Sequence, residues 1–283
     1  MRFAVVLVCW LTTTAALAVA VPAAWAQLHI VNEDGYAAMA QQAARDPALQ
    51  SAVAGELTTR AMALINAHGA GRYSVDGTQV HNTATAFTAG PSFPQLFGQA
   101  NRAAHSWLFS TPRSQDGDAW VIDVAPMLKD SAFRQILGDY NVTVPDTLKV
   151  PLTVSGPLHQ GQLNRLARWG PWVSIGAIAL TALCALLTLV AARRRGKALT
   201  GLGVSALLVG GAGWAAIEVG GRYVNDALNT TTGDVRRIAD AMVGQAEGSL
   251  HLWLNVTLVA GAALVAVGVL VAMLGSLFKR TPR

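Results

Sequence analysis

The sequence predicts a mostly α-helical membrane protein, in which a mainly helical extracytoplasmic domain with a small two-stranded sheet is joined to three or four transmembrane helices. The 283-residue chain is 52% hydrophobic and only 13% charged, about half the charge of an ordinary soluble protein. Its apolar residues gather in four stretches, each long enough for the roughly 20 helical residues that cross a hydrocarbon core. These stretches exclude a wholly soluble protein and a disordered chain. Because both cysteines, Cys9 and Cys184, lie within apolar stretches, a disulfide scaffold is excluded as well.

The first apolar stretch runs from Phe3 to Ala26 behind a single basic residue, Arg2. It ends in Ala24-Trp25-Ala26, which fits the small-x-small pattern of a signal-peptidase site. The run is long for a signal peptide, so residues 1–26 are either a cleaved signal peptide or a retained transmembrane anchor. Both alternatives place the following segment outside the cytoplasm.

Residues 27–168 form the predicted extracytoplasmic domain, and its first elements are helices. A short Ala-rich helix is expected over 34–44. Asp46-Pro47 then fits a helix N-cap followed by proline at the first helical position, and His68-Gly69 should end that helix. Its apolar face consists of Leu49, Val53, Leu57, Ala61 and Leu64.

A polar, glycine-bearing connection is expected next, through Thr85, and Pro94 opens a further helix. That helix has its apolar residues at helical spacing: Leu96, Phe97, Ala100, Ala104, Trp107 and Leu108. After an Asp116-Gly117 turn, residues 119–124 alternate as a strand does.

The rest of the domain is expected to be one helix and one strand. The helix runs from Pro126 to Leu137, and the strand alternates apolar and other residues over 147–154. Pro151 interrupts that run, so the strand should lie at a sheet edge. We expect it to pair with the strand at 119–124.

The C-terminal part is predicted to contain three transmembrane helices. The expected segments are a transmembrane helix 169–192, a cytoplasmic loop 193–198, a transmembrane helix 199–219, an extracytoplasmic loop 220–250, a transmembrane helix 251–278 and a cytoplasmic tail 279–283. The basic residues near apolar stretches are Arg2, Arg193, Arg194, Arg195, Lys197, Lys279, Arg280 and Arg283. All of these fall on the cytoplasmic side if both termini are cytoplasmic, as the positive-inside rule requires.

The distribution of charge also excludes a nucleic-acid-binding patch. The net charge is +5, yet the domain between Gln27 and Arg168 has ten basic and eleven acidic residues. Tryptophans that prefer the headgroup region lie near the ends predicted to face outward: Trp25, Trp169, Trp172, Trp214 and Trp253. The expected location is therefore the plasma (inner) membrane, crossed several times, with the large domain outside.

Small residues line the last two transmembrane segments. Glycine stripes let helix backbones approach closely in lipid; here they include Gly203, Gly210, Gly261, Gly268 and Gly275. They would pack the helices of this chain against one another, or form a docking face for other inner-membrane proteins.

The loop 220–250 contains an apolar stripe of its own, consisting of Val235, Ile238, Met242, Ala246 and Leu250. Two alternatives remain open. The stripe belongs to an amphipathic helix on the outer leaflet or against the domain, or it is a helical extension of the last transmembrane segment.

The sequence contains no hydrolase, phosphate-loop or dinucleotide motif, and its six histidines lack metal-ligand spacing, so we expect no enzyme, metal or cofactor. The candidate binding residues are Asn101, Arg102 and His105, of which Asn101 and His105 share one helix face. They would hold a ligand, or brace a neighbouring loop.

Three further motifs are Ala44-Arg45-Asp46-Pro47-Ala48 with Val53 and Leu57, then Phe97 with Gln99-Ala100-Asn101-Arg102-Ala103-Ala104-His105, and Val121-Ile122-Asp123-Val124-Ala125-Pro126. With these motifs the chain resembles uncharacterised actinobacterial integral membrane proteins that have an N-terminal anchor, an extracytoplasmic helical domain and C-terminal transmembrane helices. The resemblance spans nearly the whole chain and implies no activity.

The function expected from these observations is that of a non-enzymatic membrane protein of the cell envelope, an accessory or assembly subunit acting with other membrane proteins. The alternative is an extracytoplasmic protein that binds a lipid or an envelope precursor. Such sites are mostly apolar with a few placed polar groups, which the three candidate residues would supply.

Overall fold

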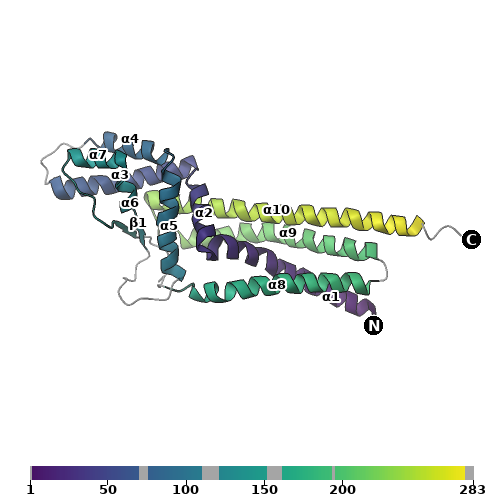
Figure 1. Cartoon of the computed structure of the whole chain (residues 1–283). Coiled ribbons are helices and arrows are strands. Elements are labelled where there is room, and N and C mark those ends of the chain that lie inside the picture. Colours follow the sequence, from purple (N-terminus) through teal and green to yellow (C-terminus); the bar gives the residue numbers. More distant parts are fainter. Residues whose placement is uncertain (1, 70–75, 110–120, 152–160, 193–194, 278–283) are drawn as a thin grey trace, which may run out of the picture. The chain divides into compact units, whose positions relative to one another are not determined.

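The computed structural model describes residues 2–69, 76–109, 121–151, 161–192 and 195–277. In chain order its elements are α1 (Arg2–Ala26), the π-helix η1 (Gln27–Val31), α2 (Glu33–Ala43), α3 (Pro47–Gly69), α4 (Gly77–Thr88), α5 (Phe93–Phe109), β1 (Val121–Asp123), α6 (Ala125–Leu128), α7 (Ser131–Asp139), β2 (Lys149–Pro151), α8 (Asn164–Ala191), α9 (Arg195–Ala227) and α10 (Gly233–Leu277), as Figure 1 shows. The predicted class, a mostly helical membrane protein with a small two-stranded sheet, is confirmed.

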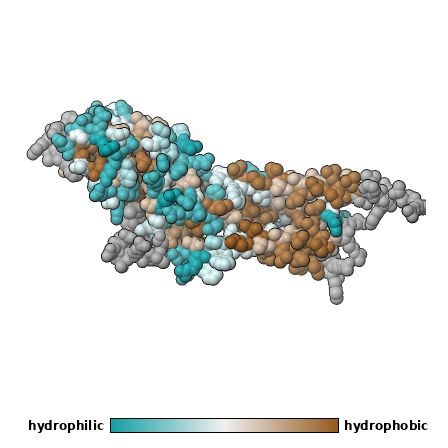
Figure 2. All heavy atoms as spheres, in the orientation of Figure 1, coloured by the Kyte–Doolittle hydropathy of each residue, from teal (hydrophilic) through white to brown (hydrophobic). Residues whose placement is uncertain are grey.

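The chain folds as two compact units. The membrane-helix unit comprises Met1–Leu28, Arg168–Arg222 and Glu247–Arg283, and the helical domain comprises His29–Ala167 and Tyr223–Ala246. Among the described residues, four helices are long and apolar enough to cross a membrane, with spans of Ala4–Val31, Asn164–Ala191, Arg195–Ala227 and Gly233–Leu274. Their surface is largely hydrophobic in Figure 2, whereas that of the helical domain is largely hydrophilic.

Hydrogen bonds between helices attach α1 to the rest of the membrane-helix unit. The Trp10 Nε1 donates to the Gly201 carbonyl of α9 at 2.8 Å, and the Thr14 and Ser205 hydroxyls are 2.8 Å apart. Near the other end of α1, the Trp25 Nε1 donates to the Ser249 hydroxyl of α10 at 3.1 Å. Polar side chains join helices in this way where the hydrophobic effect does not distinguish helix from lipid.

The predicted glycine stripes lie between α9 and α10. A Cβ on Gly203 would lie 2.6 Å from the Gly261 carbonyl oxygen, and one on Gly268 would lie 2.6 Å from the Thr200 backbone nitrogen. A Cβ on Gly210 would lie 2.6 Å from side-chain atoms of Leu258. These glycines therefore serve packing within the chain, and the surroundings of Gly275 lie outside the described residues.

The core of the helical domain is built from amphipathic helices and an aromatic cluster. Asp46 caps α3 by accepting from the Ala48 backbone N–H at 2.7 Å, and the predicted face Leu49, Val53, Leu57 and Ala61 is buried. Ile65 continues that face, with Leu64 only partly buried. The rings of Phe87 and Phe133 meet edge-on at 5.5 Å, a favoured aromatic geometry.

The polar connection expected through Thr85 is wrong for residues 77–85, because they lie in α4; residues 70–75 lie outside the described residues. Its sequence is poor in strong helix formers, but Asp76 caps it by accepting from the Thr78 and Gln79 backbone N–H groups. Val80, Ala84 and Phe87 recur at helical spacing and are buried in the core. Tertiary burial of this face therefore outweighs the weak local preference.

The single helix expected from Pro126 to Leu137 is also wrong, because the chain divides it into α6 and α7. Asp130 caps α7 by accepting from the Ala132 backbone N–H at 3.1 Å, and such a cap favours a new helix start over continuation. The division allows Met127 and Leu128 of α6 and Phe133 of α7 all to be buried in the core.

The two predicted strands pair antiparallel as β1 and β2, with Ile122 opposite Val150. The Asp123 carboxylate accepts from the Leu148 backbone N–H at 2.8 Å and from the Ala125 backbone N–H at 3.0 Å. It thus joins the sheet to the start of α6. The residues 119–120 and 152–154 of the expected strands lie outside the described residues, as does the expected turn at 116–117.

The apolar stripe of the predicted loop 220–250 belongs to the first part of α10. Val235, Ile238, Ala241 and Met242 pack against the core of the helical domain. Because α10 is one continuous helix from Gly233 to Leu277, both alternatives for this stripe hold in part: it covers the domain, and it extends the last apolar helix.

Candidate functional site

The three candidate binding residues lie on the second half of α5. The first half of α5 is fixed in the core of the helical domain by Phe93, Phe97 and Ala100. The same face continues through Ala104 and Phe109, which are also buried. Asn101 and His105 share this buried side, as their spacing predicted, whereas Arg102 lies on the exposed side.

The Asn101 side chain is used within its own helix. It is buried, with 3% of its surface exposed, and its Nδ2 donates to the Phe97 carbonyl at 2.9 Å. An amide that bonds to the carbonyl four residues earlier satisfies one of its donors locally. Asn101 is therefore a core residue of α5.

Arg102 makes ion pairs with the first turn of α2. Its Nη2 lies 2.8 Å from Asp34 Oδ1, and its Nε lies 3.5 Å from Glu33 Oε1. All three side chains are substantially exposed, so each pair contributes at most about 1 kcal/mol. Asn32 caps the same helix start by accepting from the Gly35 backbone N–H at 2.8 Å.

The His105 ring is buried and bonds to the segment that precedes α2. Its Nε2 lies 2.8 Å from the Ile30 carbonyl oxygen. Because a carbonyl oxygen can only accept, Nε2 carries a proton and donates it, which leaves Nδ1 as the other polar atom of the ring. Within the described part of the chain, no hydrogen-bond partner reaches this buried Nδ1.

Two aromatic rings enclose His105. The Phe109 ring stacks on it with centroids 4.2 Å apart and planes 17° apart. The Tyr36 ring of α2 lies at 5.1 Å, and burial raises the pKa of the Tyr36 hydroxyl to about 12. The imidazole thus fills a space between α5 and α2.

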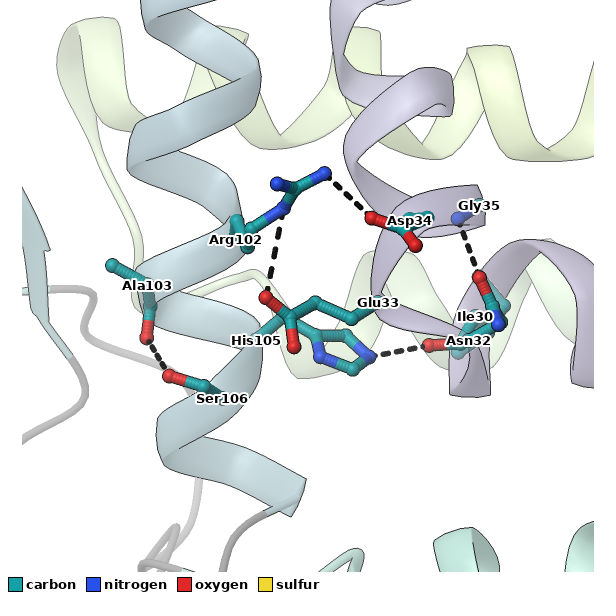
Figure 3. Close-up of polar contacts among 9 residues, drawn as sticks. All are labelled: Ile30, Asn32, Glu33, Asp34, Gly35, Arg102, Ala103, His105 and Ser106. Carbon is teal, nitrogen blue, oxygen red and sulfur yellow. Dashed lines mark hydrogen bonds and ion pairs between the residues drawn. The ribbon is translucent and has the colours of Figure 1, made fainter.

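Together these contacts tie α5 to residues 30–34, as Figure 3 shows. We call this arrangement the α5 clamp: Arg102 and His105 on α5, with Ile30 of η1 and with Glu33 and Asp34 at the start of α2. It corresponds to the alternative in which the candidate residues brace a neighbouring segment. The described residues contain no cluster of three or more histidine, cysteine or acidic side chains that could hold a metal ion.

Sequence reasoning missed the partners of His105. Phe109 follows His105 by four residues, so helical spacing could have identified it. The Ile30 carbonyl is a backbone group and has no sequence signal, and Tyr36 is too distant in the chain for spacing to connect it with His105.

Two cavities elsewhere in the described part of the chain have the volume usual for ligand sites, roughly 300–1,000 Å³. One, of about 430 Å³, lies in the helical domain between Lys129, Arg134, Leu137 and Val142. The other, of about 580 Å³, lies in the membrane-helix unit beside Trp10 and Lys197. Neither has Asn101, Arg102 or His105 in its wall.

No protein-family model matches the chain, and no curated protein or solved structure matches it either.

Proposed function

We propose that this membrane protein is a non-enzymatic accessory or assembly subunit of the cell envelope, which acts with other membrane proteins. In this proposal it resides in the plasma (inner) membrane with its helical domain outside the cytoplasm. The basic residues beside the apolar stretches support this orientation, since positive charge is retained on the cytoplasmic side.

The observation that carries the proposal is how the helical domain holds the chain segments that continue into membrane helices. The α5 clamp fixes residues 30–34, which follow α1. Val235, Ile238 and Met242 fix the start of α10 in the domain core. A domain that packs these two chain segments into its own structure suits a subunit that presents an ordered surface to its partners.

The candidate polar residues support this function more than ligand binding. The hydrogen bonds and ion pairs of Asn101, Arg102 and His105 described above go to groups of the same chain. A binding site would need such groups to converge on a cavity.

A photo-crosslinking amino acid placed on α8 tests the proposal in cells. Ile178 is 49% exposed and Thr188 only 2% exposed, so they form a matched outward and inward pair on one helix. We expect a discrete protein adduct from position 178 and none from position 188. The full chain, solubilised gently, should also co-purify with the same protein in fixed stoichiometry by mass spectrometry. A clean monomer without adducts would contradict the proposal.

The cleft of about 430 Å³ in the helical domain favours a second candidate function, the binding of an anionic lipid or envelope precursor. Arg134 supplies positive charge there, and the cleft is also lined by Lys129, whose Nζ lies 3.0 Å from Asp146 Oδ1, and by the buried side chains of Leu137 and Val142. Mass spectrometry of small molecules extracted from the purified full chain tests this function. We expect Arg134→Gln to reduce the bound anionic compound, and Arg102→Gln, which lies away from the cleft, to leave it unchanged. Equal retention in both variants would eliminate the cleft as its site.

A further inference from the structure

A groove of about 580 Å³ opens in the membrane-helix unit between α1, α9 and α10. Its walls include Trp10 of α1, Val204 of α9, and Val269 and Met273 of α10. These side chains are apolar or aromatic, and they lie in helices apolar enough to cross a membrane. The groove therefore suits a hydrocarbon chain.

The position of Lys197 gives the groove one charged end. Lys197 is the third residue of α9, which begins at Arg195, whereas Val204 lies seven residues further along, roughly 10 Å at the helical rise. Trp10 is held between them, because its Nε1 donates to the Gly201 carbonyl at 2.8 Å. A ligand in the groove would thus meet an ammonium group at one end and apolar walls along its length.

The charge around Lys197 selects an anionic ligand. Segments 1–32, 147–217 and 252–283 contain no aspartate or glutamate, and the ion pairs found among the described residues do not include Lys197. Arg195 lies two residues away in the same first turn, where the helix dipole also favours negative charge. The ammonium group thus lacks a carboxylate from its own membrane segments.

We propose that this groove binds an anionic glycerophospholipid, with the phosphate on Lys197 and an acyl chain along Trp10, Val204 and Met273. Basic pockets between membrane helices commonly recognise anionic headgroups, and each lysine or arginine near the surface strengthens binding about fivefold. A zwitterionic lipid would bring its own ammonium group toward Lys197 and lose this advantage. The proposal does not depend on the proposed function.

Brominated lipids test the proposal, because bromine on an acyl chain quenches a tryptophan that it contacts. The full chain in uncharged micelles is titrated with phosphatidylglycerol or phosphatidylethanolamine that carry the same brominated chains. The signal of Trp10 is the difference between the wild type and Trp10→Phe. We expect half-quenching of this signal at about fivefold lower phosphatidylglycerol than phosphatidylethanolamine.

Three variants locate the headgroup and the chain. Lys197→Gln should remove the preference, whereas Arg222→Gln, a cation near the other end of the same helix, should keep it. Val204→Phe, which narrows the groove, should weaken quenching of Trp10 by both lipids.

Equal half-quenching by the two lipids in the wild type would overturn the proposal, and this comparison needs no variant to fold. The absence of Trp10 quenching by either lipid would also overturn it, because the groove would then be closed or occupied by something else. If Arg222→Gln and Lys197→Gln lost the preference for phosphatidylglycerol equally, the preference would arise from the overall positive charge of the protein. That result would overturn the assignment to this groove.

Discussion

Replacing His105 with alanine should release the start of α2 from α5. The substitution removes the hydrogen bond to the Ile30 carbonyl, whose net contribution is about 1 kcal/mol. It also removes ring contacts with Phe109 and Tyr36, each contributing about 0.5–1.5 kcal/mol. The free energy of opening this contact should therefore fall by about 2–4 kcal/mol. At 1.36 kcal/mol per tenfold, the equilibrium constant for opening should rise roughly 30- to 1,000-fold.

Hydrogen–deuterium exchange measures this loss directly, because the rate of amide exchange reports local opening. Amides of α2 in the full-length His105→Ala chain should exchange faster by the stated factor, while those of α7, in the same domain, serve as the internal reference. His105→Phe keeps an aromatic ring and loses the hydrogen bond, so its expected effect is about fivefold. Arg102→Gln removes two exposed ion pairs, each contributing at most about 1 kcal/mol, so it should change exchange by no more than about 30-fold, the lower end of the range for His105→Ala.

The order of these effects tests the reasoning. If α2 exchanged at the wild-type rate in His105→Ala, the clamp would contribute nothing to the stability of this segment. If Arg102→Gln had the larger effect, the exposed ion pairs, and not the buried imidazole, would hold α2. A uniform increase over α2 and α7 would indicate global destabilisation and contradict a local clamp.

Three further predictions follow from the membrane helices. Gly203→Ala should lower the thermal aggregation midpoint in detergent, because the new Cβ would clash with the backbone of α10. Gly211→Ala should leave the midpoint unchanged, because a Cβ there has no neighbouring atom within 4 Å. Equal midpoints in the two variants would contradict the packing of α9 on α10. The purified protein should retain α1, since its hydrogen bonds to α9 and α10 are part of the membrane-helix unit; an intact mass lacking everything through Ala26 would show cleavage instead. A phosphatase fusion at Thr111 should be active and one at Lys197 inactive, and the reverse pattern would refute the proposed orientation.

The sequence predicted those elements whose signals are local. The helices α2, α3 and α5 follow from caps, proline positions and apolar spacing, and the strands follow from alternation at 119–124 and 147–154. The apolar stretches needed only their length and low charge, since crossing a hydrocarbon core depends on these properties alone. Spacing along α5 also identified Asn101 and His105 as neighbours on one face.

Only the tertiary structure decided how these elements are used. The helix α4 exists because Phe87 and its neighbours are buried, although its own residues favour helix weakly. The glycines of α9 pack against α10 of the same chain, and a stripe of small residues in the sequence does not by itself identify which helix will pack against it. The Ile30 carbonyl becomes the partner of His105 because folding brings a backbone group, identical in every residue, to a distance of 2.8 Å. Sequence patterns encode which face of a helix is buried, whereas the partner of that face depends on contacts between segments far apart in the chain.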